Sequence, residues 1–209
     1  MKNNFGYRAL TPLMRILFRL YYNPKIINKE YIPSDGSIVI ACNHKHLFDQ
    51  CLTIMATKRP INYMAKKEYF DGKFSWFFKF VGCIPVDRSK KDENSKEKAL
   101  GVLNSGGAIG IFPEGTRNRD KKKVLLDFKY GAVSLAKKSD SYIVPCAVTG
   151  DYKFRSKNLM IQYGKPFKVV DLEKANDKLY KTIEDLIQDN LKKSNRSLED
   201  ELDTHFVKL

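Results

Sequence analysis

Short apolar segments alternate with helix-forming segments along most of this chain, and this alternation restricts the possible folds more than any other feature. Residues 37–42 (SIVIAC) form a continuous apolar run, which is typical of a strand buried on both faces of a sheet. Strands that alternate with helices predict an α/β sheet with helices packed on its faces. We therefore expect strands at residues 37–42, 61–65, 83–86, 108–112, 142–149 and 159–163, and helices at residues 48–57, 70–81, 92–104, 128–138 and 171–193.

The chain shows no internal repeat and no linker that would divide it. Its 209 residues suit one globular domain, and a hydrophobic fraction of 43% argues against disorder. We expect one folded domain over residues 25–209, preceded by a separate N-terminal segment at residues 1–24. Residues 194–209 are polar, and we expect them to be loosely held.

The N-terminal segment contains a short basic amphipathic helix. Thr11 is a suitable N-cap, Pro12 suits the first helical position, and Asn23-Pro24 predicts where the helix ends. Apolar side chains cover most of this helix, and its arginines share one face: Arg8, Arg15 and Arg19. We expect it to lie in the interface of an anionic membrane, with docking on its own domain as the alternative.

No segment has the length expected of a membrane span. The longest uncharged run, residues 99–113, has fifteen residues and includes four glycines. Arg15 and Arg19 interrupt the one apolar stretch that could form a signal peptide. The four cysteines lie in apolar stretches without paired spacing, as reduced thiols do. We expect a cytoplasmic protein that is peripheral on the inner face of the cell membrane.

A formal net charge of +14 predicts a polyanionic partner, which is a nucleic acid, an anionic membrane or an acidic protein. The basic residues are scattered over loops, and no recognised nucleic-acid motif occurs. We therefore expect no nucleic-acid partner. Tight, steeply salt-dependent binding of DNA or RNA would contradict this expectation.

A histidine and an aspartate, whose side chains can take part in acid–base catalysis, follow the strand predicted at residues 37–42. His44 lies in the loop after this strand, and Asp49 comes five residues later, in the first turn of the next helix. An imidazole oriented by a carboxylate can act as a general base toward a hydroxyl. The alternative interpretation is that His44 only caps the following helix. A zinc site is not predicted, because the spacing of its possible ligands does not fit one: Cys42, His44, His46 and Cys51.

Two further clusters also come at strand ends. Residues 82–88 (GCIPVDR) and residues 112–119 (FPEGTRNR) both carry arginine. A planar guanidinium can bind a phosphate with two parallel hydrogen bonds. A solvated turn is the alternative for residues 112–119.

The order of these blocks resembles the 1-acylglycerol-3-phosphate acyltransferases of phospholipid synthesis. The blocks are H-x4-D at His44 to Asp49, G-x-I-P-V-D-R at residues 82–88, F-P-E-G-T-R at residues 112–117, and a V-P strand at residues 143–145. The resemblance covers about three fifths of the chain. It implies a single α/β domain whose mixed, mostly parallel sheet is flanked by helices, the glycerolipid acyltransferase fold.

The resemblance also implies an activity. An acyl thioester, either acyl-CoA or acyl-acyl-carrier protein (acyl-ACP), would give its acyl group to the sn-2 hydroxyl of lysophosphatidic acid, forming phosphatidic acid. His44 would be the general base and Asp49 would orient it, with no acyl-enzyme, no metal and no cofactor. Arg88 and Arg117 would bind the acceptor phosphate. Glu114, Gly115 and Thr116 would shape the phosphate and glycerol pocket, and two further positions resemble the family: Asn43 and Lys129.

One position departs from the family pattern. A small residue, usually serine, is common two places after the motif histidine, and here it is His46, which alters the shape of the pocket nearby. The acceptor stays open among lysophosphatidic acid, another lysophospholipid and glycerol-3-phosphate. An inactive lipid-binding module is a further alternative, which the presence of Asp49 and Arg88 with His44 disfavours.

Overall fold

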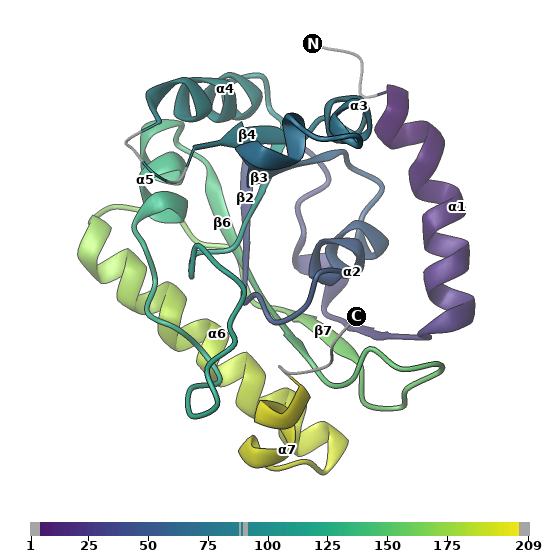
Figure 1. Ribbon diagram of the computed structural model, residues 1–209. Coiled ribbons are helices and arrows are strands. Elements are labelled where there is room, and N and C mark those ends of the chain that lie inside the picture. Colours follow the sequence, from purple (N-terminus) through teal and green to yellow (C-terminus); the bar gives the residue numbers. More distant parts are fainter. Residues whose placement is uncertain (1–4, 88, 90–91, 205–209) are drawn as a thin grey trace.

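A single sheet organises the protein. The computed structural model describes residues 5–87, 89 and 92–204, which form an α/β fold around a seven-stranded sheet (Figure 1). The strand order is β1-β7-β6-β2-β5-β3-β4, and neighbours are parallel except for the antiparallel pair β6 and β7. The predicted fold class and the mixed, mostly parallel sheet are confirmed. The strands are β1 (Lys25–Ile27), β2 (Ile38–Cys42), β3 (Ile61–Lys66), β4 (Ile84–Val86), β5 (Ala108–Ile111), β6 (Tyr142–Thr149) and β7 (Met160–Tyr163).

Helices cover both faces of the sheet (Figure 1). They are α1 (Phe5–Tyr21), α2 (Asp49–Ala56), α3 (Ser75–Phe80), α4 (Glu93–Asn104), α5 (Gly131–Lys138), α6 (Leu172–Ser194) and α7 (Leu198–Asp203), with short 3-10 turns η1 (Lys29–Tyr31) and η2 (Lys67–Phe70).

The central strand β2 separates two hydrophobic cores. Val39 and Ala41 point into the core that α4, α5 and α6 cover, on the left of Figure 1. Ile38, Ile40 and Cys42 point into the core beneath α2 and α1, on the right. Because both faces of β2 are buried, its sequence is a continuous apolar run. The parallel neighbours β5 and β6 end at the same edge of the sheet as β2, which brings their loops together.

Helix α1 begins well before the predicted cap at Thr11, so this prediction was wrong. Pro12 lies inside the helix, and Thr11 is buried. The first turn packs tightly on the domain, because a Cβ placed on Gly6 would lie 2.6 Å from the Phe80 ring and Tyr7 is buried. This packing offsets the hydrogen bond that an internal proline removes. No helix in the described part of the chain has both the length and the apolar character of a membrane span.

Two more segments differ from the prediction. The helix expected over residues 70–81 is divided into η2 and α3, because Asp71 and Gly72 favour a turn between them. The tail expected to be loosely held contains α7, so this prediction was also wrong. Ser197 and Asp200 form a capping box at the start of α7, and Glu201 is buried. Residues 205–209 lie outside the described residues.

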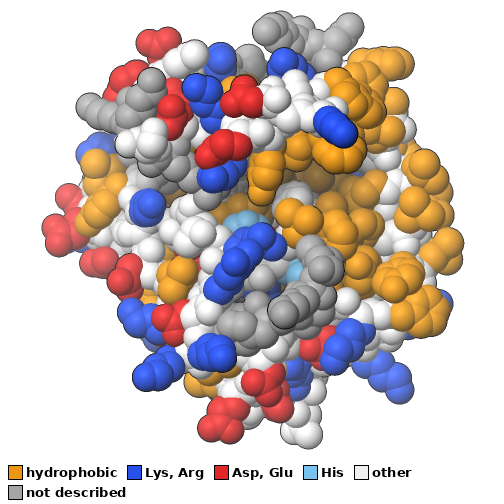
Figure 2. Space-filling model, in the orientation of Figure 1, with side chains coloured by type: hydrophobic (Ala, Val, Ile, Leu, Met, Phe, Trp, Pro, Cys, Tyr) orange, Lys and Arg blue, Asp and Glu red, His pale blue; other side chains and the backbone are white. Residues whose placement is uncertain are grey.

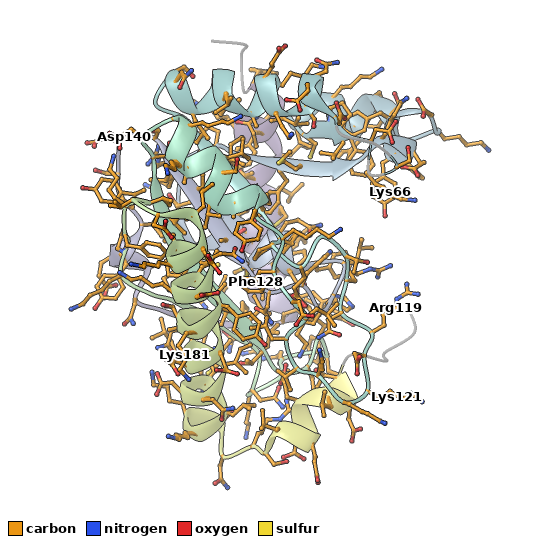
Figure 3. The ribbon with its side chains drawn as sticks, turned by 90° about the vertical axis from the view of Figure 1, so that its left-hand side faces the viewer. Lys66, Arg119, Lys121, Phe128, Asp140 and Lys181 are labelled. Atoms are coloured by element: carbon orange, nitrogen blue, oxygen red, sulfur yellow. The ribbon has the colours of Figure 1, made fainter. Side chains whose placement is uncertain are left out.

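The loop that follows β5 is closed at its base and anchored to α6. The Lys129 N–H donates to the Pro113 carbonyl over 2.8 Å. Phe128 lies against α6, where its ring meets Tyr180 edge-on at 5.0 Å between centroids (Figure 3). Arg119 is exposed and projects outward from this loop (Figure 3). The base of the loop is therefore fixed, whereas Arg119 faces outward.

Candidate active site

His44 and Asp49 meet at the carboxyl end of β2. The spacing predicted a hydrogen bond between them, and His44 Nδ1 lies 2.9 Å from Asp49 Oδ2. Because a carboxylate only accepts hydrogen bonds, Nδ1 carries the proton and the lone pair is left on Nε2. The His44 side chain is 14% exposed, whereas that of Asp49 is fully buried. The imidazole is therefore oriented by a fully buried carboxylate and is itself partly exposed.

Four donors hold the Asp49 carboxylate. Besides His44, the backbone N–H groups of Lys45 and His46 each donate to Oδ2 over 2.8 Å. The Tyr152 hydroxyl donates to Oδ1 over 2.6 Å. These hydrogen bonds compensate both carboxylate oxygens for the water that they lose on burial. Asp49 thus fixes both the imidazole and the backbone of the loop that carries it.

Glu114 joins the loop after β5 to the loop after β2. Its Oε1 accepts from the His44 N–H over 2.6 Å, and its Oε2 accepts from the Leu126 N–H over 2.9 Å. The Asn118 N–H adds a third link by donating to the His44 carbonyl over 2.6 Å. Burial raises the pKa of Glu114 to about 7, although its two N–H donors oppose this shift. The carboxylate holds two loops in register and is not itself open to solvent.

The His44 ring is also held by stacking. It lies parallel to the Phe112 ring, with centroids 3.9 Å apart and an interplanar angle of 11°. Phe112 in turn stacks on Tyr63 of β3 at 5.6 Å. One face of the imidazole is therefore covered by the strand end that carries the F-P-E-G-T-R block.

The remaining predicted residues of this loop lie around Glu114. Gly115 has a positive φ of 73°, and a Cβ there would lie 3.0 Å from the Lys129 side chain, which identifies Lys129 as its neighbour. Thr116 is exposed and Arg117 is half-buried. The prediction for Arg88 falls on a residue outside the described part of the chain.

Asn43 does not face the solvent. Its side chain is buried and pairs with the backbone of Val148 in β6, donating through Nδ2 over 2.9 Å and accepting through Oδ1 over 2.7 Å. Asn43 therefore links the loop that carries His44 to the neighbouring strand.

His46 is buried against an aromatic partner. Its ring stacks on Tyr152 with centroids 4.0 Å apart, and its Nδ1 accepts from the Phe48 N–H over 3.2 Å. Burial lowers the pKa of His46, and the charges of Lys45 and Arg117 lower it further, whereas Asp49 opposes them. His46 thus occupies the place of the usual serine by packing on the tyrosine that holds Asp49.

Lys45 anchors the same loop to the C-terminal part of the chain. Its ammonium forms an ion pair with Glu201 of α7, and it donates to Thr204 and, over 2.9 Å, to the Gly150 carbonyl. Both charged side chains of the pair are 1% exposed. Glu201 also accepts from the Gly150 N–H over 2.9 Å. The loop that carries His44 is therefore fastened by a buried ion pair.

Sequence reasoning missed Tyr152, Lys45 and Glu201. Tyr152 follows β6, the strand beside β2, so its position after a predicted strand was a usable signal. Lys45 and Glu201 lie 156 residues apart, and no spacing rule connects them. Among the described residues, no group of three or more His, Cys, Asp or Glu side chains is arranged to hold a metal ion.

The site opens into a hollow on one face of the molecule. In the space-filling view a histidine is visible in this hollow, with Lys and Arg side chains on one side and apolar side chains on the other (Figure 2). A base at the floor, cations on one wall and apolar groups on the other suit a substrate with an anionic end and a hydrocarbon end.

Comparisons with known proteins identify the family. Residues 23–149, which include both loops of the site, match the family model described as Acyltransferase. The 1-acyl-sn-glycerol-3-phosphate acyltransferase of Bacillus subtilis is 31% identical over 171 residues, which cover 79% of this chain and 84% of that relative. The corresponding enzyme of Streptococcus pneumoniae is 27% identical over 181 residues, covering 83% of this chain and 66% of that relative.

A solved structure has the same fold. The crystal structure of the 1-acyl-sn-glycerophosphate acyltransferase PlsC from Thermotoga maritima matches with a TM-score of 0.71 at 18% identity, covering 94% of this chain and 85% of that one. The predicted resemblance is therefore confirmed, since the family model spans more than half of the sequence. The chain belongs to the acyltransferase family, among the O-acyltransferases related to the bacterial 1-acyl-sn-glycerol-3-phosphate acyltransferases.

Proposed function

We propose that this protein transfers a fatty acyl group from an acyl thioester to the sn-2 hydroxyl of 1-acylglycerol-3-phosphate, forming phosphatidic acid. The observation that carries the proposal is the His44 and Asp49 pair, whose hydrogen bond leaves the lone pair of a partly exposed imidazole on Nε2. The names of the relatives support the choice of acceptor, because both act on 1-acyl-sn-glycerol-3-phosphate.

The proposed reaction is a direct transfer. Nε2 of His44 takes the proton of the acceptor hydroxyl while its oxygen attacks the thioester carbonyl. The tetrahedral intermediate collapses, the carbon–sulfur bond breaks, and the leaving thiolate takes the proton back from the imidazolium. Asp49 stabilises this imidazolium across the 2.9 Å hydrogen bond. The products are the acylated glycerolipid and the free thiol.

Binding of the acceptor phosphate is assigned to the loop after β5. Arg117 is half-buried and lies near His46, so a phosphate bound there would bring the glycerol toward His44. Lys129 lies beside Gly115 and adds a second cation. Arg88, implied by the family motif, would complete this phosphate site. Arg117→Ala is then expected to raise KM for the acceptor and to leave KM for the donor unchanged.

The catalytic assignment is tested with His44→Ala. We expect kcat/KM to fall by about 10²–10⁴, as for loss of a general base, while the urea unfolding curve stays close to that of the parent. His46→Ser is the matched control, because it changes a histidine of the same loop to the residue that the family usually has there. Turnover by His44→Ala at the level of His46→Ser would refute the mechanism.

Acceptor and donor are identified by one panel. Lysophosphatidic acid, another lysophospholipid and glycerol-3-phosphate are each assayed with acyl-CoA and with acyl-ACP. We expect lysophosphatidic acid to give the highest kcat/KM. A higher kcat/KM for glycerol-3-phosphate would instead indicate that the protein catalyses the first acylation of the glycerol backbone.

We further propose that α1 places the protein on a membrane surface as a peripheral protein. Six of its apolar side chains are more than half exposed, and four of these form a band along one face of the helix (Figure 2): Leu13, Ile16, Leu17 and Leu20. Leaving such a band in water is unfavourable, and an amphipathic helix of this kind binds lipid interfaces.

Deleting α1 would not test this proposal cleanly, because Gly6, Tyr7 and Arg15 pack on the domain. The better variant carries Leu13→Gln, Leu17→Gln and Leu20→Gln. We expect it to lose vesicle binding and to keep its turnover of a detergent-dispersed acceptor. Unchanged vesicle binding would refute the role of α1.

A further inference from the structure

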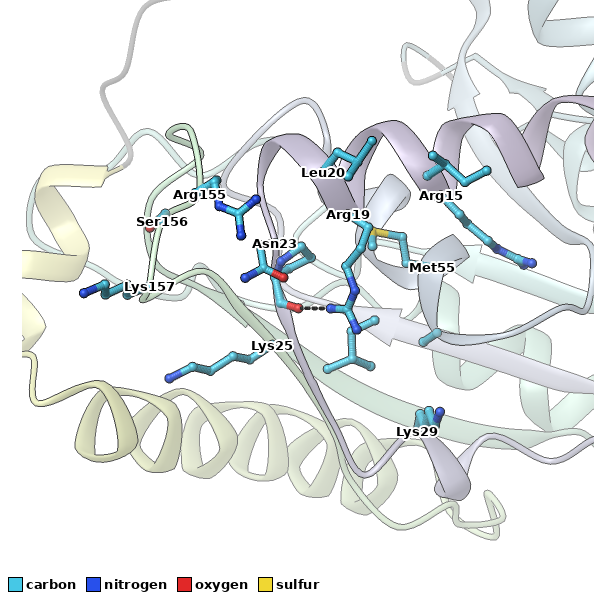
Figure 4. A pocket seen from close by; sticks show the side chains of 14 residues that line it. Arg15, Arg19, Leu20, Asn23, Lys25, Lys29, Met55, Arg155, Ser156 and Lys157 are labelled. Atoms are coloured by element: carbon cyan, nitrogen blue, oxygen red, sulfur yellow. Dashed lines mark hydrogen bonds between the residues drawn. The ribbon is translucent and has the colours of Figure 1, made fainter.

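A basic groove lies beside α1, away from the catalytic loop. It has a volume of about 950 Å³ and runs between α1, the end of α2, the start of β1 and the loop after β6 (Figure 4). Six cationic side chains line it: Arg15, Arg19, Lys25, Lys29, Arg155 and Lys157. Within the described part of the chain, no Asp or Glu lines the groove. The groove therefore gathers positive charge without a carboxylate to neutralise it.

Two of the six cations have a structural role. Arg15 Nε donates to the Ile54 carbonyl over 3.1 Å, and its guanidinium also bonds the Thr57 carbonyl, at the end of α2. Arg19 donates to the Pro24 carbonyl over 2.9 Å (Figure 4). A cation at the carboxyl end of a helix is favourable, so Arg15 fastens α1 to α2.

The other four cations have no such role. Lys25, Lys29, Arg155 and Lys157 are exposed, and none of them forms an ion pair with another described residue. Four like charges around one groove repel each other, and an anion bound between them relieves that repulsion. Their placement therefore favours an anionic ligand.

The backbone holds Arg155 over the groove. Arg155 has a positive φ of 46°, which is uncommon for a residue with a side chain, and its N–H donates to the Tyr21 carbonyl over 2.6 Å at the end of α1. Phe154, the residue before it, stacks edge-on on Tyr21 at 5.3 Å. The loop after β6 is thus fixed to α1, so Arg155 and α1 form one surface.

The neighbouring apolar side chains indicate which anion the groove accepts. Ile16 and Leu20 line the groove and also belong to the exposed apolar band of α1. A ligand bound here would have its charge beside the four cations and its hydrocarbon along the band. A membrane phospholipid with an anionic headgroup has this arrangement, whereas an acidic protein has no long hydrocarbon part to cover the band.

We propose that this groove binds the anionic headgroup of a membrane phospholipid and makes membrane binding selective for negatively charged lipid. The proposal rests on the proposed membrane location of α1 and adds a specific headgroup site to it. This site is separate from that of the acceptor phosphate, because neither His44 nor Arg117 lines the groove.

The test compares two variants of equal net charge. The groove variant carries Lys25→Gln, Lys29→Gln, Arg155→Gln and Lys157→Gln. The control variant neutralises four exposed lysines on other surfaces: Lys137→Gln, Lys138→Gln, Lys174→Gln and Lys192→Gln. Binding is measured by sedimentation with phosphatidylcholine vesicles, with and without phosphatidylglycerol.

On vesicles with phosphatidylglycerol, we expect the groove variant to bind at least about tenfold more weakly than the parent protein, because one basic residue at an anionic surface contributes about fivefold. The control variant is expected to lose less than about threefold. On pure phosphatidylcholine the three proteins are expected to bind alike through α1. Equal losses for the two variants on anionic vesicles would overturn the proposal, since only overall charge would then matter.

Two further measurements separate this proposal from the proposed function. Turnover of a detergent-dispersed acceptor reports acyl transfer without a membrane, and the groove variant is expected to keep it. If the groove variant instead shows a raised KM for acyl-ACP and unchanged vesicle binding, the groove is a donor-docking surface and the headgroup proposal is wrong.

Discussion

The buried ion pair between Lys45 and Glu201 allows a quantitative prediction. Glu201→Leu removes the carboxylate that pairs with the Lys45 ammonium and accepts from the Gly150 N–H. The ammonium then keeps only two neutral acceptors, the Gly150 carbonyl and the Thr204 hydroxyl. The Lys45 ammonium then has no counter-charge from Glu201, and the Gly150 N–H loses its acceptor. Both losses occur in the interior, because the side chains of Lys45 and Glu201 are each 1% exposed.

Removing one partner of a buried ion pair destabilises a protein by about 3–5 kcal/mol. Burial already lowers the pKa of Lys45, and the Glu201 charge is the main effect opposing that shift. In Glu201→Leu this opposition is lost, so Lys45 releases its proton more easily, which limits the penalty. We therefore expect the free energy of unfolding to fall by about 3 kcal/mol, the lower end of this range.

The assay is urea unfolding at pH 7, followed by circular dichroism. Glu199→Leu is the matched control, because Glu199 is exposed in the first turn of the same helix, where an acidic side chain contributes about 0.3–1 kcal/mol. The double variant Lys45→Met with Glu201→Leu removes both charges and is expected to recover most of the loss. The reasoning fails if Glu201→Leu costs no more than Glu199→Leu, or if the double variant is less stable than Glu201→Leu alone.

Three more predictions concern the groups around Asp49. Tyr152→Phe removes the 2.6 Å hydrogen bond to Asp49, so the free energy of unfolding should fall by about 1.5–3 kcal/mol. In steady-state kinetics, kcat should drop on the order of tenfold, whereas KM should change little. Glu114 holds a proton up to about pH 7 in the folded state and only to its usual lower pKa when unfolded, so its contribution to stability falls as pH rises toward 7. Unfolding curves of Glu114→Gln at pH 5, 6 and 7 should lack this decline, and an unchanged decline would contradict the assignment. His46 has the opposite effect, because its lowered pKa makes the unfolded state take up the proton first on acidification. His46→Ser should therefore lose less stability than the parent between pH 7 and pH 5, and an equal loss would count against a buried neutral imidazole.

Local patterns predicted most of the sheet. Buried parallel strands are continuous apolar runs, and the strand expected at residues 142–149 is observed as Tyr142–Thr149. The helix expected at residues 171–193 is observed as α6, which Asp171 caps by accepting from the Lys174 N–H. The edge strand β1 was missed because its three residues begin with a charged side chain directly after Asn23-Pro24, a pair that predicts a turn. Helix α7 was missed because its buried residue is Glu201, and a search for hydrophobic periodicity does not detect an ion pair.

In the site, too, local contacts were predicted and contacts between distant segments were missed. His44 lies in the loop after β2 and Asp49 is the first residue of α2, so five residues of spacing were enough to predict that they meet. The groups that hold them come from distant segments: Tyr152 from the loop after β6 and Glu201 from α7. Their proximity depends on the strand order and on the packing of α7, which a single sequence does not encode as a local signal.

The central position of β2 has a consequence for synthesis. Ile38 pairs with Ala108 of β5 on one side and with Tyr142 of β6 on the other, and both partners come much later in the chain. At about 5–20 residues per second, β5 follows roughly 4–14 s after β2 leaves the ribosome's catalytic centre, and β6 several seconds after that. In this interval a fully apolar strand has two unpaired edges, which other strands can bind. The nascent chain is therefore most prone to aggregation before β5 and β6 emerge, and chaperone binding is expected to be strongest there.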